Sequence, residues 1–168
     1  MATVKTALKP EEAQFLAAAF PQFVHNNGTN FPVVGLSYDA TTEEKAYWQF
    51  KASSYGSGNL TLVLRWYADT ASANNVVWGC RLAAITPDTD TQDVETDGFA
   101  TQQTVIDSHL GTTGQRIHTC SITISNLDSI AADDECWLEI SRVGTDAVND
   151  TMTGDAILIT SELQYSDT

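Results

Sequence analysis

The acidic segment between residues 88 and 98 holds the densest group of side chains that could bind a metal ion. It carries five carboxylates, and the candidate calcium ligands are Asp88, Asp90 and Asp93. Calcium takes about six to eight oxygen ligands. An EF-hand loop is excluded because Gln92 stands at the third ligand position and Asp93 stands where glycine is required. We expect a solvated loop of mutually repelling charges and no cofactor, with calcium at these aspartates as the weaker alternative.

Two further polar groups favour structural roles. Residues 149–155 read Asn-Asp-Thr-Met-Thr-Gly-Asp, and such side chains bond their own backbone in turns, so we expect a turn there. His118 and Cys120 share one face of a strand and could begin a metal site. No Cys-x-x-Cys or His-x-x-x-His supplies further ligands, so both are predicted to be core residues. His25 and His109 lie in loop-like sequence without a partner.

No motif for nucleophilic or metal-assisted catalysis is present in the sequence. A Gly-x-Ser-x-Gly elbow and a His-Glu-x-x-His helix are both absent. The run Gly56-Ser57-Gly58 is too short for a phosphate loop and has no following lysine. Glycoside cleavage uses a pair of carboxylates. With 22 Asp and Glu, close pairs of carboxylates are expected in any fold, so such a pair would not indicate this activity. We therefore predict that the protein is not an enzyme and has no catalytic residues.

Apolar side chains alternate with polar ones over most of the chain after residue 30, which indicates β-strands. The clearest case is Leu60, Leu62, Leu64 and Trp66, which alternate with a second face of residues. Four more strands are predicted around residues 76–84, 117–124, 136–141 and 157–165, and weaker ones around 33–38, 46–52 and 102–108. Short turn-rich pieces separate them.

About eight short alternating strands with frequent turns indicate two packed antiparallel sheets. That number suits a jelly roll better than a seven-stranded immunoglobulin domain, whose Cys-Trp-Cys hallmark is also missing. We predict an all-β antiparallel sandwich of jelly-roll type over residues 31–168.

Residues 1–30 differ from the rest in character. Pro10 could begin a helix with Glu11 and Glu12 in its first turn, and Pro21 would end it. A helix of about ten residues is marginal alone, so its apolar side chains must pack on the domain or on a neighbouring molecule. These side chains are Phe15, Leu16, Phe20 and Phe23. With a polar linker at 25–30, the segment is predicted to be an N-terminal arm.

Trp137 differs from the other three tryptophans in its neighbours. The others are in register with apolar residues and are predicted to lie in the core, whereas Trp137 shares its strand face with Glu139 and Ser141. Tryptophan is enriched in the hot spots of protein interfaces. Half-buried packing, a protein contact and sugar stacking are therefore all open for this side chain.

The charge and cysteine content exclude several classes of protein. Eight Lys and Arg face 22 Asp and Glu in 168 residues, a net charge of −14, and the cations are scattered singly. Phosphate backbones and anionic membranes repel such a surface, so we expect no nucleic acid and no membrane partner. Cys80, Cys120 and Cys136 are odd in number and lie in apolar runs, which favours buried thiols. Without a recognisable secretory signal, folding in a reducing cytoplasm is the default expectation.

Four segments together resemble a known group of proteins. They are Ala46-Tyr-Trp-Gln-Phe50, Val76-Val-Trp-Gly-Cys80, Asp97-Gly-Phe-Ala-Thr101 and Asp150-Thr-Met-Thr-Gly-Asp155 leading into Leu163-Gln-Tyr165. In this order they are similar to tailed-bacteriophage virion proteins with a jelly-roll domain, over roughly residues 31 to 165. These motifs consist of core aromatic and turn residues, so they bear on the fold more than on the role.

The resemblance implies a virion structural protein, commonly a homotrimer, made in the host cytoplasm. The chain has no repetitive shaft, which favours a capsid decoration (cement) protein on the capsid exterior that cross-bridges the major capsid protein or other virion subunits. On this interpretation the four apolar arm residues contact the shell or a neighbour, and Trp137 lies at the trimer contact. A tail fibre, baseplate or receptor-binding component and a carbohydrate-binding module are the alternatives.

Overall fold

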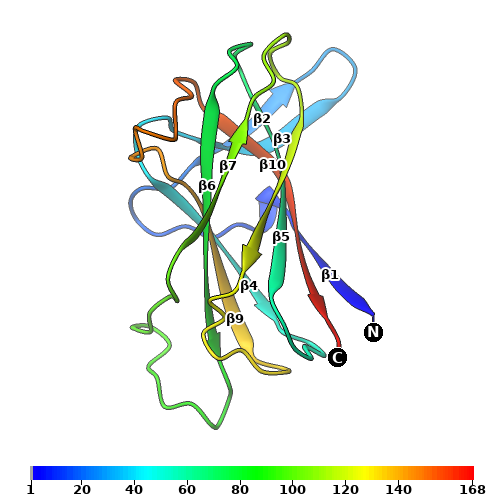
Figure 1. The fold of residues 1–168 in the computed structure, drawn as a ribbon, viewed down its shortest axis with the longest axis vertical. Helices are drawn as coiled ribbons and strands as arrows, with labels where there is room; N and C mark the ends of the chain where they lie inside the picture. The colour runs from blue at the N-terminus through cyan, green and yellow to red at the C-terminus, as the bar shows by residue number, and fades with distance from the viewer. Residues whose placement is uncertain (1) are drawn as a thin grey trace.

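The computed structural model describes residues 2–168, which form two antiparallel sheets (Figure 1). The strands are β1 (Thr3–Leu8), β2 (Gln22–Asn27), β3 (Pro32–Tyr38), β4 (Glu44–Lys51), β5 (Leu60–Ala68), β6 (Asn75–Ile85), β7 (Gln103–Ser108), β8 (His118–Ile124), β9 (Glu135–Arg142) and β10 (Ala156–Ser166), and one 3-10 helix, η1 (Pro10–Glu12), follows β1. Sheet A has the order β2-β3-β10-β5-β8, with β1 also paired to β10, and sheet B has the order β4-β9-β6-β7. The predicted all-β sandwich is confirmed.

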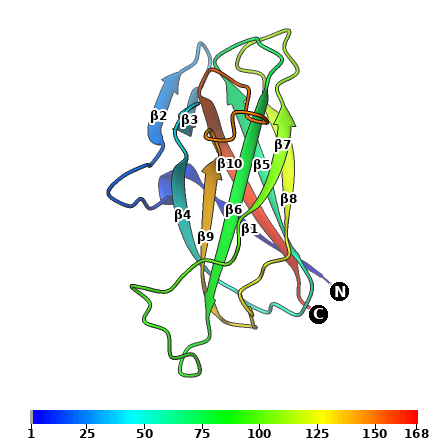
Figure 2. The same ribbon diagram turned by 60° about the vertical axis from the view of Figure 1, so that its left-hand side comes forward.

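Strands β3 to β10 form a jelly roll. The pairs β3·β10, β4·β9, β5·β8 and β6·β7 are all antiparallel, so this part of the chain is one long hairpin whose tip is the β6–β7 connection. Consecutive pairs lie alternately in sheets A and B, which rolls the hairpin into the two layers seen in Figure 2. Within each sheet, one further pairing joins the two strand pairs: β10·β5 in sheet A and β6·β9 in sheet B. This rolled hairpin begins at Pro32, close to where the sequence pattern becomes β.

The hydrophobic core lies between the sheets and is built from alternate residues of each strand. Trp48, Trp66 and Trp78, predicted to be core residues, are at most 2% exposed. The ring centroids of Trp66 and Trp78 are 6.1 Å apart with an interplanar angle of 64°, and Tyr38 meets Trp78 edge-on at 5.2 Å. Such edge contacts add to the stability that area burial gives aromatic side chains.

The three thiols and His118 lie in this core, as the sequence predicts. Cys80, Cys120 and Cys136 are free and buried, and His118 is 7% exposed. Burial raises the pKa of the Cys80 and Cys136 thiols to about 12, because the charged thiolate is disfavoured away from water.

The prediction of a helix between Pro10 and Pro21 is wrong. The residues of η1 make one 3-10 turn, and the chain then runs beside β4. Gln14 and Tyr47 exchange two backbone hydrogen bonds of 2.8 and 3.0 Å, and the Lys45 nitrogen donates to the carbonyl of Ala19 at 2.9 Å. A short helix has too few internal hydrogen bonds to outlast its costly nucleation, whereas the open edge of β4 offers ready backbone partners.

The rest of residues 2–30 belongs to sheet A instead of forming an arm. Strand β1 pairs with the second half of β10 over its whole length, and Leu8 is 3% exposed in the core. Strand β2 pairs with β3 from Gln22 to Asn27. The predicted polar linker at 25–30 is therefore the end of a strand and the turn of a β-hairpin.

The polar segment 149–155 is a structural loop, as the sequence predicts. The Asp150 carboxylate accepts a hydrogen bond from the Val77 backbone nitrogen at 2.9 Å and forms an ion pair with Arg142. The Asn149 side chain donates to Asp146 Oδ2 at 2.8 Å. Among residues 2–168, no helix has the length and hydropathy to cross a bilayer.

Candidate functional site

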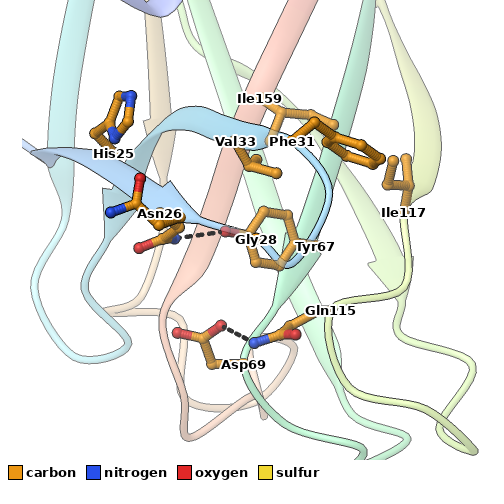
Figure 3. A pocket seen from close by; sticks show the side chains of 11 residues that line it. His25, Asn26, Gly28, Phe31, Val33, Tyr67, Asp69, Gln115, Ile117 and Ile159 are labelled. Atoms are coloured by element: carbon orange, nitrogen blue, oxygen red, sulfur yellow. Dashed lines mark hydrogen bonds between the residues drawn. The ribbon is translucent and has the colours of Figure 1, made fainter.

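A groove of about 520 Å³ lies on the outer face of sheet A, between the β2–β3 hairpin and the segment that precedes β8 (Figure 3). We call it the sheet A groove. It is lined by His25, Asn26, Asn27, Gly28, Phe31, Val33, Tyr67, Asp69, Gln115, Ile117 and Ile159.

The β2–β3 hairpin forms one wall of the sheet A groove. Asn26 is paired with Val33 across the two strands. At Gly28 an added Cβ atom would lie 2.5 Å from the carbonyl oxygen of Phe31, so glycine is needed for the tight turn. The turn holds Phe31 with 70% of its surface exposed, and Figure 3 shows its ring directed toward Ile117.

The floor of the groove comes from sheet A itself. Tyr67 points away from the core because side chains alternate along β5, yet it is 6% exposed. The register between β10 and β5 shifts between Leu158 and Thr160. Such a bulge re-aims the extra residue of a strand, and here it leaves Ile159 beside Val33 in the groove.

Two polar pairs fix hydrogen-bonding groups in the groove. Asn26 Nδ2 donates to Tyr67 Oη at 2.9 Å, and Gln115 Nε2 donates to Asp69 Oδ1 at 3.5 Å. The Gln115 backbone is itself held by a 2.8 Å bond to the carbonyl of Ala68. The Asn26 amide oxygen and the free oxygen of Asp69 retain acceptor capacity, and the Gln115 amide retains a donor. Figure 3 places the Asp69–Gln115 pair at the far end from Phe31.

The chemistry of the lining residues favours an uncharged ligand with both polar and apolar faces. The polar groups are amides, a phenol, an imidazole and one carboxylate, and no Lys or Arg is among the lining residues. Anionic ligands are held mainly by cations. Phe31 and Ile117 are 70% and 60% exposed, so both can be covered by a ligand without refolding the wall.

A second groove, of about 340 Å³, lies on the outer face of sheet B, and we call it the sheet B groove. It brings together three of the residues predicted to lie at two different interfaces: Phe15, Leu16 and Trp137. The ring of Phe20 lies 5.7 Å from that of Phe15. Phe23 is not part of this groove, because it lies on β2 in the other sheet.

A buried acidic side chain lies on the same face of β9 as Trp137. Glu139 is 2% exposed, and Arg81 Nε lies 3.6 Å from Glu139 Oε1. Burial raises the pKa of Glu139 above its ordinary value. Burial and then the charge of Glu139 raise the pKa of Tyr47 to about 12. Tyr47 therefore stays neutral as part of the groove lining.

The calcium alternative receives no support from the acidic loop. Asp90 Oδ2 accepts from the Thr86 backbone nitrogen at 2.7 Å, and Asp93 Oδ1 accepts from the Glu95 nitrogen at 3.0 Å. Both carboxylates thus stabilise local turns, and Asp88 lies with φ 63° inside the turn that Thr86 and Asp90 close. Across residues 2–168, no three His, Cys, Asp or Glu side chains are placed to hold a metal ion.

Sequence reasoning missed the surroundings of two histidines. His109 is fully buried, and its ring centroid lies 4.5 Å from that of His118. Its Nδ1 accepts a 3.2 Å hydrogen bond from the backbone nitrogen of Gly111. His25 lines the sheet A groove. No spacing in the sequence pairs His109 with His118, because the contact joins β8 to the loop after β7.

The sheet A groove was also missed, although one signal for it was present. Asn27-Gly28 between two strand-like runs is a strong hairpin signal, and the hairpin makes one wall. The opposite wall, with Gln115 and Ile117, is adjacent only through the pairing of β5 with β8.

No family model matches the sequence, and no curated protein is significantly similar to it. Solved structures with similar architecture include the CBM36-1 domain of a multidomain xylanase from the hindgut metagenome of Trinervitermes trinervoides, with 11% identity, a TM-score of 0.49 and coverage of 95% of this chain and 96% of that one. A family 11 carbohydrate-binding module from Clostridium thermocellum has 11% identity, a TM-score of 0.47 and coverage of 96% and 87%. CBM27-1 of Caldicellulosiruptor saccharolyticus in complex with mannohexaose has 8% identity, a TM-score of 0.43 and coverage of 95% and 96%. At these scores the likeness concerns the β-sandwich arrangement and assigns no ligand to this chain.

Proposed function

We propose that the protein is a non-catalytic carbohydrate-binding module that holds a neutral glycan in the sheet A groove. The observation that carries the proposal is the composition of this groove. Exposed apolar surface of Phe31 and Ile117 lies at one end of the groove, and the amide and carboxylate groups of Gln115 and Asp69 lie at the other end.

A neutral sugar ring matches this composition on both of its faces. Its C–H groups form an apolar face that can cover an aromatic or aliphatic side chain, and its hydroxyl groups both donate and accept hydrogen bonds. Asp69 offers acceptors, whereas the Asn26 and Gln115 amides offer both donors and acceptors. Sites built of apolar walls with a few fixed polar groups are the usual form of small-ligand sites, and about 520 Å³ is within their range.

Calorimetric titration with defined neutral glycans tests the proposal. The probes are mixed-linked β-glucan, xylan and mannohexaose, with polygalacturonate as the anionic comparison. We expect binding of at least one neutral probe and none of polygalacturonate, because the net charge of −14 and the Asp69 carboxylate repel acidic sugars. If no neutral glycan binds at millimolar concentration, or if polygalacturonate alone binds, the proposal is wrong.

Two substitutions assign the binding to the sheet A groove. Phe31→Ala removes the exposed ring and should weaken affinity about tenfold. Gln115→Ala removes one hydrogen-bonding amide and should weaken it about threefold to tenfold. Ile106→Ala is the matched control, since Ile106 is a 50% exposed side chain on β7 of the other sheet. Equal affinity in all four proteins would place the glycan elsewhere.

A virion decoration protein is the second candidate, supported by the sequence resemblance and by one feature of the surface. Phe15, Leu16, Phe20 and Phe23 are 39%, 65%, 36% and 51% exposed. Phe15, Leu16 and Phe20 lie together and are suited to contact another subunit, whereas Phe23 offers a separate contact on β2. Binding to an assembled shell would stabilise it by mass action, and a homotrimer would add avidity.

Immunogold electron microscopy of particles from the source cells tests the second candidate. Labelling over the capsid exterior supports decoration, whereas labelling confined to the tail supports the fibre or baseplate alternative. Unlabelled particles from cells that contain the protein would exclude both roles.

A further inference from the structure

The sheet B groove has a floor of aromatic and small side chains. Trp137 on β9 is paired with Ala83 on β6, and the short alanine side chain leaves space beside the indole. Tyr47 on β4 completes the floor, and the ring of Phe99 lies 5.9 Å from that of Tyr47. Each of these strands presents alternate residues to the outer face, so the floor is fixed by the sheet.

Two connecting segments form the walls of this groove. On the β4 side, the backbone bonds between Gln14 and Tyr47 hold Phe15 and Leu16 at the groove. On the β6 side, the loop of residues 86–102 contributes Val94 and other side chains. Leu16 and Val94 are 65% and 58% exposed, so apolar surface remains uncovered on both walls.

The loop wall is strongly acidic and has no cation of its own. Residues 86–102 contain five Asp and Glu and no Lys or Arg. None of the ion pairs found among residues 2–168 involves these carboxylates. Asp97, which lines the groove, has one oxygen bonded to the Gly98 nitrogen at 2.9 Å, while its buried Oδ2 accepts no hydrogen bond.

We propose that the sheet B groove docks a segment of a partner protein that carries a bulky apolar side chain next to Lys or Arg. The apolar residue covers Trp137 and Leu16, and the cation reaches Asp97 and Glu95. A neutral glycan fits this groove less well, because it brings no cation to the unpaired carboxylates of the loop wall. A second copy of this chain is disfavoured, because two molecules with net charge −14 repel each other. This site is separate from the sheet A groove and does not depend on the glycan proposal.

Fluorescence anisotropy with synthetic peptides tests this docking site on the intact protein. The probes are labelled pentapeptides with Trp or Leu at the centre and Lys at the flanking positions, and matched peptides with Ser or Glu in place of Lys. We expect the Lys peptides to bind, the Ser peptides to bind about fivefold more weakly and the Glu peptides not to bind. Affinity for the Lys peptides should fall as salt rises.

Substitutions in the groove separate its apolar and electrostatic contributions. Trp137→Ala should weaken Lys-peptide binding at least about tenfold, and Asp97→Asn about fivefold with a smaller salt dependence. Phe31→Ala in the sheet A groove is the control and should leave peptide binding unchanged. Circular dichroism checks that each variant is folded.

Other outcomes overturn the proposal. Lys peptides that fail to bind show that the groove is not their site. So do Lys peptides that bind Trp137→Ala and Asp97→Asn as tightly as they bind the wild-type protein. Glycan binding that is lost in Trp137→Ala and kept in Phe31→Ala would make this groove a sugar site. Sedimentation that shows an oligomer abolished by Trp137→Ala would make a second copy the occupant.

Discussion

Arg142 on β9 and Asp150 in the following loop form an ion pair whose two side chains are completely buried. Arg142 Nε donates to Asp150 Oδ2 at 3.0 Å, and Arg142 Nη2 donates to Asp150 Oδ1 at 2.7 Å. The remaining guanidinium donors meet the backbone carbonyls of Tyr38, Met152 and Gly154. All five donors are therefore satisfied, and the pair joins β9, β3 and the loop before β10.

Breaking this pair should be strongly destabilising. Arg142→Met leaves the Asp150 charge buried without its cation, with only the Val77 backbone nitrogen still donating to it, which costs about 3–5 kcal/mol of unfolding free energy. Urea denaturation measures the loss. Lys51→Met is the control, because Lys51 and Asp133 form a 3.0 Å pair with side chains 51% and 66% exposed. The control should change stability by less than about 1 kcal/mol, and equal effects of the two substitutions would contradict the structural role given to Arg142.

The position of residues 2–30 in the fold can be tested with two leucines. Leu8→Ala removes a core side chain that is 3% exposed and should cost about 2–5 kcal/mol. Leu16→Ala alters a 65% exposed side chain and should change stability by less than about 0.5 kcal/mol. Thermal or urea unfolding compares the two proteins. A free arm would predict no effect from either substitution, so a silent Leu8→Ala would argue against β1 as part of sheet A.

Mild acid is expected to destabilise the fold through His118. Burial and the neighbouring His109 lower the pKa of His118 from 6.5, with Asp107 opposing and Arg116 adding to the shift. The unfolded chain therefore binds the proton before the folded chain does. The free energy of unfolding should be unaffected above about pH 7.5 and should fall as the pH drops below about 6.5.

Urea midpoints between pH 8 and pH 5 measure this pH dependence. His118→Leu should flatten the curve over that range. Glu139→Gln should make the decline steeper at its acidic end, because the raised pKa of Glu139 means that the folded chain takes up that proton first as the pH falls. A His118→Leu protein with the same slope as the wild type would show that another group controls acid sensitivity.

The three thiols should resist modification in the native state. Cys80, Cys120 and Cys136 are buried and free, and burial raises the pKa of Cys80 and Cys136 to about 12. The reactive thiolate is therefore scarce at neutral pH. Iodoacetamide followed by mass spectrometry should label none of them rapidly in buffer and all three in urea. Rapid labelling of one thiol in buffer would reveal local opening around it.

The sequence pattern predicts the sandwich well because alternation reports directly on which face of a strand is buried. The strongest predicted strands alternate over their whole length. Residues 60–67 are the clearest example, and they form β5 in the structure. The arm was misread because Pro10, Glu11 and Glu12 form a local helix-start signal. That signal could not reveal the competing backbone partners on β4, which come from a distant part of the chain.

The candidate sites were less predictable, because each is assembled from segments far apart in the sequence. The sheet A groove joins residue 31 of one hairpin to residues 115 and 117 across two strands, β10 and β5. The sheet B groove places Phe15 and Leu16 near Trp137, although the three had been assigned to two separate contacts. Residue type marked Phe15, Leu16 and Trp137 as candidate contact residues, but only the sheet order determines that they line the same groove.

The two ends of the described chain lie together: the Ala2 nitrogen donates to Asp167 Oδ1 at 2.7 Å, and the Asp167 nitrogen donates to the Ala2 carbonyl at 3.2 Å. Both ribbon views place them at the opposite end of the sandwich from the β2–β3 hairpin (Figures 1 and 2). A support, dye or fused polypeptide attached at either end would therefore leave the β2–β3 hairpin, and the sheet A groove that it borders, exposed to solvent. A short linker could equally join the two ends into a circular polypeptide that retains both grooves.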